Sequence, residues 1–214
     1  MILNVSGRTD IVAFYTDWFM NRYREGFVDV RNPFNPKMIS RINFNNVDMI
    51  LFCTKNPVPI IPYLKEIKMP ILFHITLTSY NKDIEPGVID KKRVIEGIKE
   101  ISSIIGIDNV VVRYDPIFLN DKYNFEYHKK AFNKMCILLK GHIKKIVVSF
   151  IDESKNTKNN KNILRYRDFS EDDYREIGES FSKSAKDNGM VVQTCFEDRN
   201  LVEYGFVKGE CLSH

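Results

Sequence analysis

Cysteine is scarce in this sequence: four of the 214 residues are cysteines, and none of them are spaced as CxxC or CxxxC. Scattered cysteines in a chain of this size argue against a disulfide framework. Long apolar runs are also missing, since no stretch approaches the roughly 18 residues that a membrane-spanning helix needs. The first residues lack the basic stretch and apolar core of a signal peptide. The sequence therefore predicts a cytoplasmic protein.

Signature motifs of common enzyme classes are missing as well. No GxGxxG follows the first apolar run, and no P-loop, zinc-ligand spacing or Ser–His–Asp order is present. A dinucleotide-binding fold is therefore disfavoured, and no metal ligands are predicted from the residues. The net charge is only +4, which permits an anionic small-molecule ligand but does not argue for duplex nucleic acid.

The chain does contain a series of short apolar runs rich in Val, Ile and Phe. With 43% hydrophobic and 28% charged residues, it is predicted to fold as one domain over residues 1–214. Continuous apolar runs are typical of strands covered on both faces of a parallel sheet. Six runs fit that description: Ile2–Val5, Met49–Cys53, Ile71–Leu77, Val110–Tyr114, Lys145–Ile151 and Met190–Cys195.

Helical patterns separate most of these runs, and such alternation predicts right-handed crossovers between parallel strands. A hairpin over Phe27–Arg31 and Met38–Phe44 interrupts the alternation. The polar stretch Lys155–Lys161 is interpreted as a solvated loop rather than as a nucleic-acid patch. Periodicity does not decide between a partly closed barrel and an open doubly wound sheet. The expected helices cover Ile11–Glu25, Pro57–Ile67, Tyr123–Lys140 and Ser170–Gly189, and a further one follows Asp90 and carries Val94 to Ile105.

Polar residues follow the strands at the ends where ligands bind in parallel α/β folds. Arg113 and Asp115 are two positions apart on one predicted strand, so their side chains face the same side. A buried guanidinium needs an anion. That anion is either Asp115, in a structural ion pair, or the carboxylate or phosphate of a ligand.

Lys55 and His74 are the other two candidate catalytic residues. Lys55 directly follows an apolar strand and precedes Asn56; its ammonium can bind phosphate or act as a base or Schiff-base amine, or it is a plain surface lysine. His74 shares a strand face with Thr76. It is interpreted either as a proton carrier near neutral pH or as a hydrogen-bonded core histidine.

The remaining candidates are polar residues that we expect to contact a ligand. Asp10 is also a good helix N-cap, and Arg8 is equally suited to pair with it. The segment Arg31-Asn32-Pro33 is either a lid over the site or a tight turn. The full set of expected ligand-binding residues is Arg8, Asp10, Arg31, Asn32, Asn56, Thr76, Ser149 and Gln193.

Several stretches together resemble one bacterial family, the domain-of-unknown-function family eighteen-forty-eight. Each stretch is weak alone, but together they are specific and run through almost the whole chain. They are Ser6–Tyr15, Trp18–Arg22, Val30–Lys37, Thr54–Pro57, Asp83–Gly87, Arg113–Ile117 and Gln193–Cys195.

The resemblance implies a fold and a cofactor, although the family's function is not established. Members look like relatives of radical S-adenosylmethionine enzymes, and Arg113–Pro116 is similar to a stretch in spore photoproduct lyase-like proteins. This implies an α/β fold of the six-stranded parallel (β/α)6 type, a partial TIM-type barrel with an inserted β-hairpin near 27–44. It also implies S-adenosylmethionine as a ligand and a 4Fe–4S cluster held by cysteines in a tail beyond a position like Cys211.

Two hypotheses follow. In the first, the chain is a barrel enzyme that binds an anionic or nucleotide-like ligand through Arg113, Lys55 and Arg8. In the second, it is a non-catalytic binding or regulatory barrel. The chain ends at His214, and none of Cys53, Cys136, Cys195 and Cys211 has cluster spacing. We therefore expect the chain as given to carry no iron–sulfur cluster.

Overall fold

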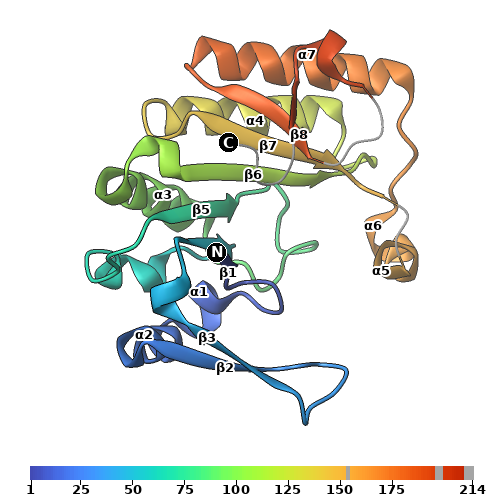
Figure 1. Cartoon of the computed structure of the whole chain (residues 1–214). Coiled ribbons are helices and arrows are strands. Elements are labelled where there is room, and N and C mark those ends of the chain that lie inside the picture. Colours follow the sequence, from blue (N-terminus) through green and yellow to red (C-terminus); the bar gives the residue numbers. More distant parts are fainter. Residues whose placement is uncertain (153–154, 196–199, 210–214) are drawn as a thin grey trace.

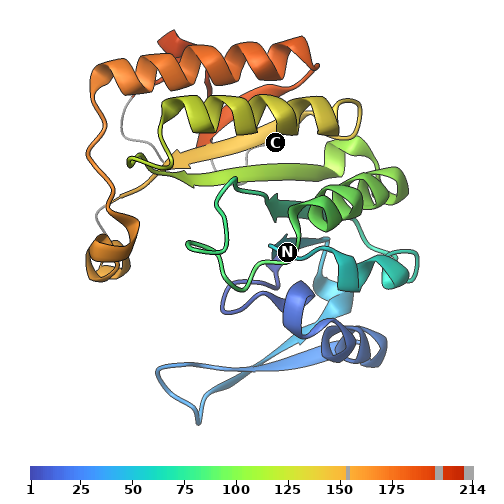
Figure 2. The same ribbon diagram turned by 180° about the vertical axis from the view of Figure 1, so that it is seen from behind.

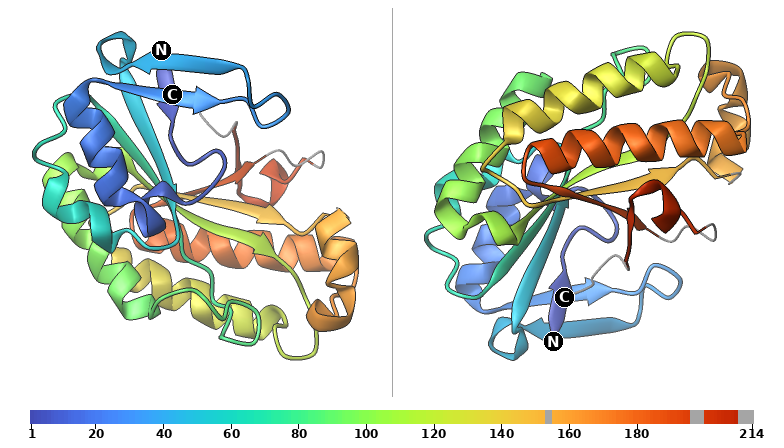
Figure 3. Two further views of the ribbon diagram at one scale, coloured as in Figure 1. Left: turned by 90° about the horizontal axis from the view of Figure 1, so that it is seen from below. Right: turned by 90° about the horizontal axis from the view of Figure 1, so that it is seen from above.

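The computed structural model describes residues 1–152, 155–195 and 200–209. Its centre is a parallel sheet of seven strands, which lie side by side in the order in which they occur along the chain (Figures 1 and 3). The strands are β1 (Ile2–Asn4), β4 (Met49–Thr54), β5 (Ile71–Thr76), β6 (Val110–Ile117), β7 (Lys145–Phe150), β8 (Val191–Cys195) and β9 (Val207–Gly209). The six expected strands and their order are confirmed, and the expected strand count is wrong by one. The additional strand, β9, has only three residues and pairs with β8 at the edge of the sheet.

The three long helices lie along one face of the sheet, as Figure 2 shows from behind. They are α3 (Lys91–Ile105), α4 (Phe125–Leu139) and α7 (Glu171–Asp187). The shorter ones are α1 (Ile11–Phe14), α2 (Thr16–Glu25), α5 (Lys155–Asn159) and α6 (Lys161–Leu164), with 3-10 turns η1 (Phe44–Asn46), η2 (Val58–Tyr63), η3 (Ile107–Asn109) and η4 (Val202–Tyr204). Within the described part of the chain, no helix has the length and apolar character needed to cross a membrane.

In three segments the secondary structure differs from the expected one, each time for a physical reason. The helix expected over Ile11–Glu25 is interrupted at Tyr15, which caps α1 and begins α2. The segment after Pro57 is a 3-10 turn that contains Pro62, and a proline inside a helix lacks the N–H of an α-helical hydrogen bond. The stretch Lys155–Lys161 is not a plain loop, because α5 and α6 occupy it. Such short helices show no apolar period in the sequence.

The hairpin is confirmed as a separate two-stranded antiparallel sheet, formed by β2 (Phe27–Arg31) and β3 (Ile39–Asn43). Asp29 and Arg41 stand opposite each other across the two strands. They form two hydrogen bonds of 2.7 Å each, and the Arg41 guanidinium lies 4.1 Å from the centre of the Phe27 ring. This arrangement holds one face of the hairpin together.

The two faces of the main sheet have different surroundings. Side chains such as Phe73 and Val112 pack into the large hydrophobic core that includes α3, α4 and α7. Because side chains alternate along a strand, their neighbours point to the opposite face, where Val111 and Val147 form a smaller apolar cluster. We call this opposite side the inner face. Every second residue of each strand lies on it: positions 72, 74 and 76 of β5, 111, 113 and 115 of β6, 145, 147 and 149 of β7, and 191, 193 and 195 of β8.

Replacing Gly178 in α7 by alanine is expected to destabilise the protein, although alanine usually stabilises a helix interior by about 1 kcal/mol relative to glycine. A Cβ atom at Gly178 would lie 2.4 Å from the Cβ of Tyr204 and 3.2 Å from the Tyr204 carbonyl oxygen, so η4 would have to move off α7. We expect a net loss of about 1–3 kcal/mol in unfolding free energy, measured in urea. Glu179→Ala, at an exposed position of the same helix, is the control and should change little. An increase in stability of Gly178→Ala would contradict the close packing.

Candidate functional site

Arg113 and Asp115 form an ion pair on the inner face, near the carboxyl end of β6. Nε of Arg113 donates to Oδ2 of Asp115 over 2.9 Å, and Nη2 donates to the same oxygen. The two side chains are 19% and 11% exposed, respectively. Burial lowers the pKa of Arg113, but the charge and hydrogen bonds of Asp115 and a hydrogen bond to Cys195 outweigh this, so the net shift is upward. The guanidinium is therefore a permanent cation that keeps partial contact with solvent.

Other predicted residues lie beside this pair because the strands are in register. Thr76 on β5 stands next to Arg113, and Val147 and then Gln193 continue the same row on β7 and β8. Ser149 lies on the inner face of β7, two positions after Val147. The structure thus gathers the predicted residues Arg113, Asp115, Thr76, Ser149 and Gln193 at one end of the sheet. Gln193 also has a packing role, since a Cβ atom at Gly209 would lie 2.1 Å from its amide nitrogen.

His74 lies on the same face, one row nearer the amino ends of the strands. It is 5% exposed and stands in register with Cys53 and Val111. Burial lowers the pKa of His74 to about 4, with further lowering by the charges of Arg113 and Lys145. The imidazole is therefore neutral at neutral pH. This pKa does not suit a proton carrier near neutral pH.

Lys55 is not brought into contact with this group. Its ammonium binds Glu85 over 2.5 Å, and Glu85 also accepts hydrogen bonds from Lys91 and Thr78. Burial raises the pKa of Glu85, but the hydrogen bonds from Lys55, Lys91 and Thr78 outweigh it and lower the pKa overall. Lys91 and Thr78 line a separate cavity beside α3 and α4. The ion-pair partner of Lys55 is therefore Glu85, whereas that of Arg113 is Asp115, and joint action of Lys55 and Arg113 on a ligand stays a prediction.

Asp10 and Asn56 are used in local structure. Asp10 caps α1 by accepting a 2.9 Å hydrogen bond from the backbone N–H of Ala13, which confirms the N-cap interpretation. Its other oxygen accepts 2.9 Å hydrogen bonds from the Thr54 hydroxyl and the Lys55 backbone N–H. The Asn56 side chain accepts from the backbone of Val58 over 3.3 Å. Both residues thus hold the end of β4 in place.

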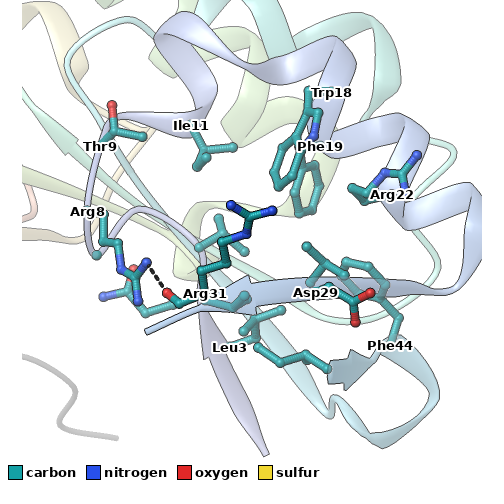
Figure 4. A pocket seen from close by; sticks show the side chains of 16 residues that line it. Leu3, Arg8, Thr9, Ile11, Trp18, Phe19, Arg22, Asp29, Arg31 and Phe44 are labelled. Atoms are coloured by element: carbon teal, nitrogen blue, oxygen red, sulfur yellow. Dashed lines mark hydrogen bonds between the residues drawn. The ribbon is translucent and has the colours of Figure 1, made fainter. Parts of the chain in front are cut away.

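Arg8 and Arg31 line a cavity between the hairpin, β1 and α2, shown in Figure 4. Arg8 does not pair with Asp10; its Nη1 donates to the backbone carbonyl of Arg31 over 2.7 Å. Asn32 forms a turn, since its side-chain oxygen accepts from the backbone N–H groups of Phe34 and Asn35 over 2.8 and 3.3 Å. The turn interpretation of the hairpin tip is confirmed, and these residues lie outside the row around Arg113.

Two inner-face residues were not among the expected site residues. Cys195, interpreted from the sequence as a small buried hydrophobe, is indeed 6% exposed, but its thiol forms a hydrogen bond with Arg113. Lys145 begins β7 in the same row as Val111 and lowers the pKa of His74. The sequence could have indicated that Cys195 lies on the same face as Gln193, because the two residues are two positions apart on one strand. For Lys145 the sequence offers no comparable indication.

The described residues do not fit a 4Fe–4S cluster. Cys53 on β4 and Cys195 on β8 are separated by three intervening strands, and Cys136 is fully buried in α4, among the helices of the core. No three His, Cys, Asp or Glu side chains within residues 1–152, 155–195 and 200–209 are grouped so that they could hold a metal ion. Cys211 lies outside the described residues. We therefore derive no chemical step through a cluster.

Comparison with solved structures finds a similar fold in a spore photoproduct lyase. The fold is similar to that of a spore photoproduct lyase mutant solved with bound AdoMet and a dinucleoside spore photoproduct, with a TM-score of 0.59 at 10% sequence identity. The match covers 90% of this chain, which spans 60% of the lyase chain. An HpcH/HpaI aldolase from Desulfitobacterium hafniense matches over 98% of this chain and 84% of its own, at 10% identity and a TM-score of only 0.33.

The sequence itself points to one family. Comparison with curated proteins gives no match. The family described as Domain of unknown function (DUF1848) matches residues 2–214, nearly the whole chain, as the resemblance of its motifs implied. The chain belongs to the DUF1848 family.

Proposed function

We propose that this chain is a barrel-type enzyme, related to radical S-adenosylmethionine proteins, that binds an anionic or nucleotide-like ligand at the carboxyl ends of β5 to β8. The observation that carries the proposal is the position of the Arg113–Asp115 pair. It lies on the inner face, away from the helices, at the end of the sheet where ligands bind in parallel α/β folds.

Arg113 retains hydrogen-bonding capacity for such a ligand. A guanidinium has five N–H donors. Two of its nitrogens donate to a single oxygen of Asp115, and one further bond goes to Cys195. Donors therefore remain for a ligand carboxylate or phosphate, which arginine binds with charge-assisted hydrogen bonds. Asp115 holds the guanidinium in place.

S-adenosylmethionine suits this donor set. Its carboxylate would bind Arg113, and its ribose hydroxyls would bind polar side chains such as Thr76 and Ser149 on the neighbouring strands. The neutral ring of His74 would supply a hydrogen bond below them. Bound beside a reduced 4Fe–4S cluster, S-adenosylmethionine would supply radical chemistry. The described residues do not group as ligands for such a cluster.

A second candidate function is a non-catalytic binding or regulatory barrel. It is favoured by one observation, the wide separation of Cys53, Cys136 and Cys195 among the described residues. In that case the Arg113 site binds a ligand without transforming it.

Replacing Arg113 should weaken binding of the ligand roughly ten- to a hundredfold, because a charge-assisted hydrogen bond in a pocket contributes about 1.5–3 kcal/mol. Calorimetric titration with S-adenosylmethionine and with adenosine monophosphate measures the effect. The variant is Arg113→Met with Asp115→Leu, so that no carboxylate is left unpaired. Arg24→Met, which removes a surface arginine bound to Glu66, is the control. Equal affinities in the parent and the double variant would contradict the proposed site.

A further inference from the structure

The cavity between the hairpin and α2 is partly open to solvent and is distinct from the row around Arg113. It has a volume of about 530 Å³ and is walled by β1, the loop after β1, α2 and the two hairpin strands (Figure 4). Small-molecule sites usually measure about 300–1,000 Å³. We call it the hairpin pocket. None of its lining residues belongs to the inner-face row.

The walls of the hairpin pocket are largely apolar and partly aromatic. Leu3, Ile11 and Val28 line it together with the rings of Phe19 and Phe44. These two rings pack edge to face with their centres 6.0 Å apart. Trp18 also lines the pocket and is 47% exposed, so its indole remains accessible to a ligand. Such walls suit a flat apolar body.

Charged groups in the pocket are predominantly positive. Asp29 is the acidic lining residue, and both of its oxygens are engaged by Arg41 at 2.7 Å. Arg22 pairs with Glu25 over 2.6 Å. The Arg31 guanidinium has no ion-pair partner within the described part of the chain, and in Figure 4 it extends from β2 toward Ile11 and Phe19.

Arg8 adds a second cation next to Arg31. One of its nitrogens donates to the Arg31 carbonyl, which fixes the guanidinium at the pocket and leaves further N–H donors. An apolar, aromatic cavity that also holds an arginine without a counter-charge matches one class of ligand. That class has a flat ring system and an attached anionic group.

We infer that the hairpin pocket binds a small organic anion with a flat apolar body. The ring system would lie against Phe19 and Trp18, and its carboxylate, sulfonate or phosphate would bind Arg31 and Arg8. This site goes beyond the function proposed above and does not depend on it.

Trp18 makes the inference directly testable, because it is the only tryptophan in the chain. Energy transfer from tryptophan to a bound fluorescent probe therefore falls steeply with the distance of the probe from Trp18, and the variants below test whether that probe lies in the hairpin pocket. The anionic probe is anilinonaphthalene sulfonate, and the uncharged probe of similar shape is phenylnaphthylamine. We expect tryptophan-sensitised emission from both, with the anionic probe bound roughly tenfold more tightly.

Arg31→Met removes the charge but keeps a long apolar stem. It should weaken binding of the anionic probe roughly tenfold and leave the uncharged probe unchanged. Lys37→Met removes the same charge at an exposed position of the same hairpin, outside the pocket lining, and should alter neither affinity. Arg8→Met provides a second variant, with a weakening in the same direction.

Three results would overturn the inference. They are probe emission that is not sensitised by Trp18, equal affinities for the two probes, or an effect of Lys37→Met as large as that of Arg31→Met. The double variant Arg113→Met with Asp115→Leu should leave the sensitised signal unchanged. Failure at the inner face and failure at the hairpin pocket are therefore distinguishable.

Discussion

The free energy of unfolding is expected to fall by about 4 kcal/mol between about pH 7 and about pH 5, because two histidines are buried as neutral rings. His74 is 5% exposed and His128 is fully buried. Burial lowers the pKa of each to about 4, and Arg113 and Lys145 add to the effect at His74. The backbone hydrogen bond of His128 to Phe118 opposes the shift without reversing it.

The hydrogen bonds of His128 explain why the neutral ring is required. Nε2 lies 3.0 Å from the Phe118 carbonyl oxygen, which can only accept, so Nε2 carries the hydrogen. Nδ1 then accepts from the Tyr114 hydroxyl over 2.8 Å, and the Ser79 hydroxyl lies 2.6 Å from that of Tyr114. A proton on Nδ1 would face the hydroxyl hydrogen of Tyr114, and this buried chain of hydrogen bonds would have to rearrange.

The direction of the change in unfolding free energy with pH follows from the pKa values of the histidines in the folded and unfolded states. The unfolded chain takes up a proton on each histidine near pH 6.5, whereas the folded protein does so only near pH 4. Stability is therefore complete above about pH 6.5 and is lost as the pH falls toward about 4. Each histidine accounts for about 2 kcal/mol between about pH 7 and about pH 5. The carboxylate with the most lowered pKa, Asp173 at about 2, responds only at lower pH.

Urea unfolding at a series of pH values measures this dependence. His128→Gln keeps one donor and one acceptor but does not titrate, so it should remove about half of the pH dependence. His74→Gln should remove the other half, and the double variant should be nearly independent of pH in this window. An unchanged slope in both single variants would show that other groups are responsible.

The elements that the sequence predicted well have local signals. The strands around Phe73 and Val112 are continuous apolar runs, and Ser170 caps the N-terminus of α7 in a capping box whose two hydrogen bonds are present. The strand β9 has no such signal, because its three residues are ordered by pairing with β8. The row of residues around Arg113 on the inner face also lacks a local signal. Its members are set by the register between strands, which cannot be read from a single sequence.

From the sequence, only that part of the candidate site could be predicted that follows from the alternation of side chains along one strand. The spacing of Arg113 and Asp115 placed both on one face, and they are in contact. Lys55 was expected with them because it also follows a strand. The partner that decides its position is Glu85, a residue of the distant segment before α3. Likewise, Arg8 and Arg31 meet through the placement of the hairpin, for which the strands themselves carry no signal.

Arg113→Met alone is expected to lower the free energy of unfolding by about 3–5 kcal/mol, because it leaves a largely desolvated carboxylate without its partner. Asp115 is 11% exposed, and both nitrogens that contact it come from Arg113. Exchanging both residues, as Arg113→Met with Asp115→Leu, removes the charges together and replaces them with apolar side chains of similar size. We expect this double variant to recover much of the loss.

A double-mutant cycle in urea measures the coupling between the two residues. The control is Arg24→Met at the surface pair with Glu66, whose side chains are 47% and 39% exposed. Water screens that pair, so its removal should matter far less. If Arg113→Met is no more destabilising than Arg24→Met, the inner-face pair is solvated and its carboxylate needs no partner. If the double variant regains stability but still loses the ligand, Arg113 contacts the ligand in addition to stabilising the fold. If the double variant recovers both stability and ligand affinity, Arg113 and Asp115 stabilise the fold and do not contact the ligand.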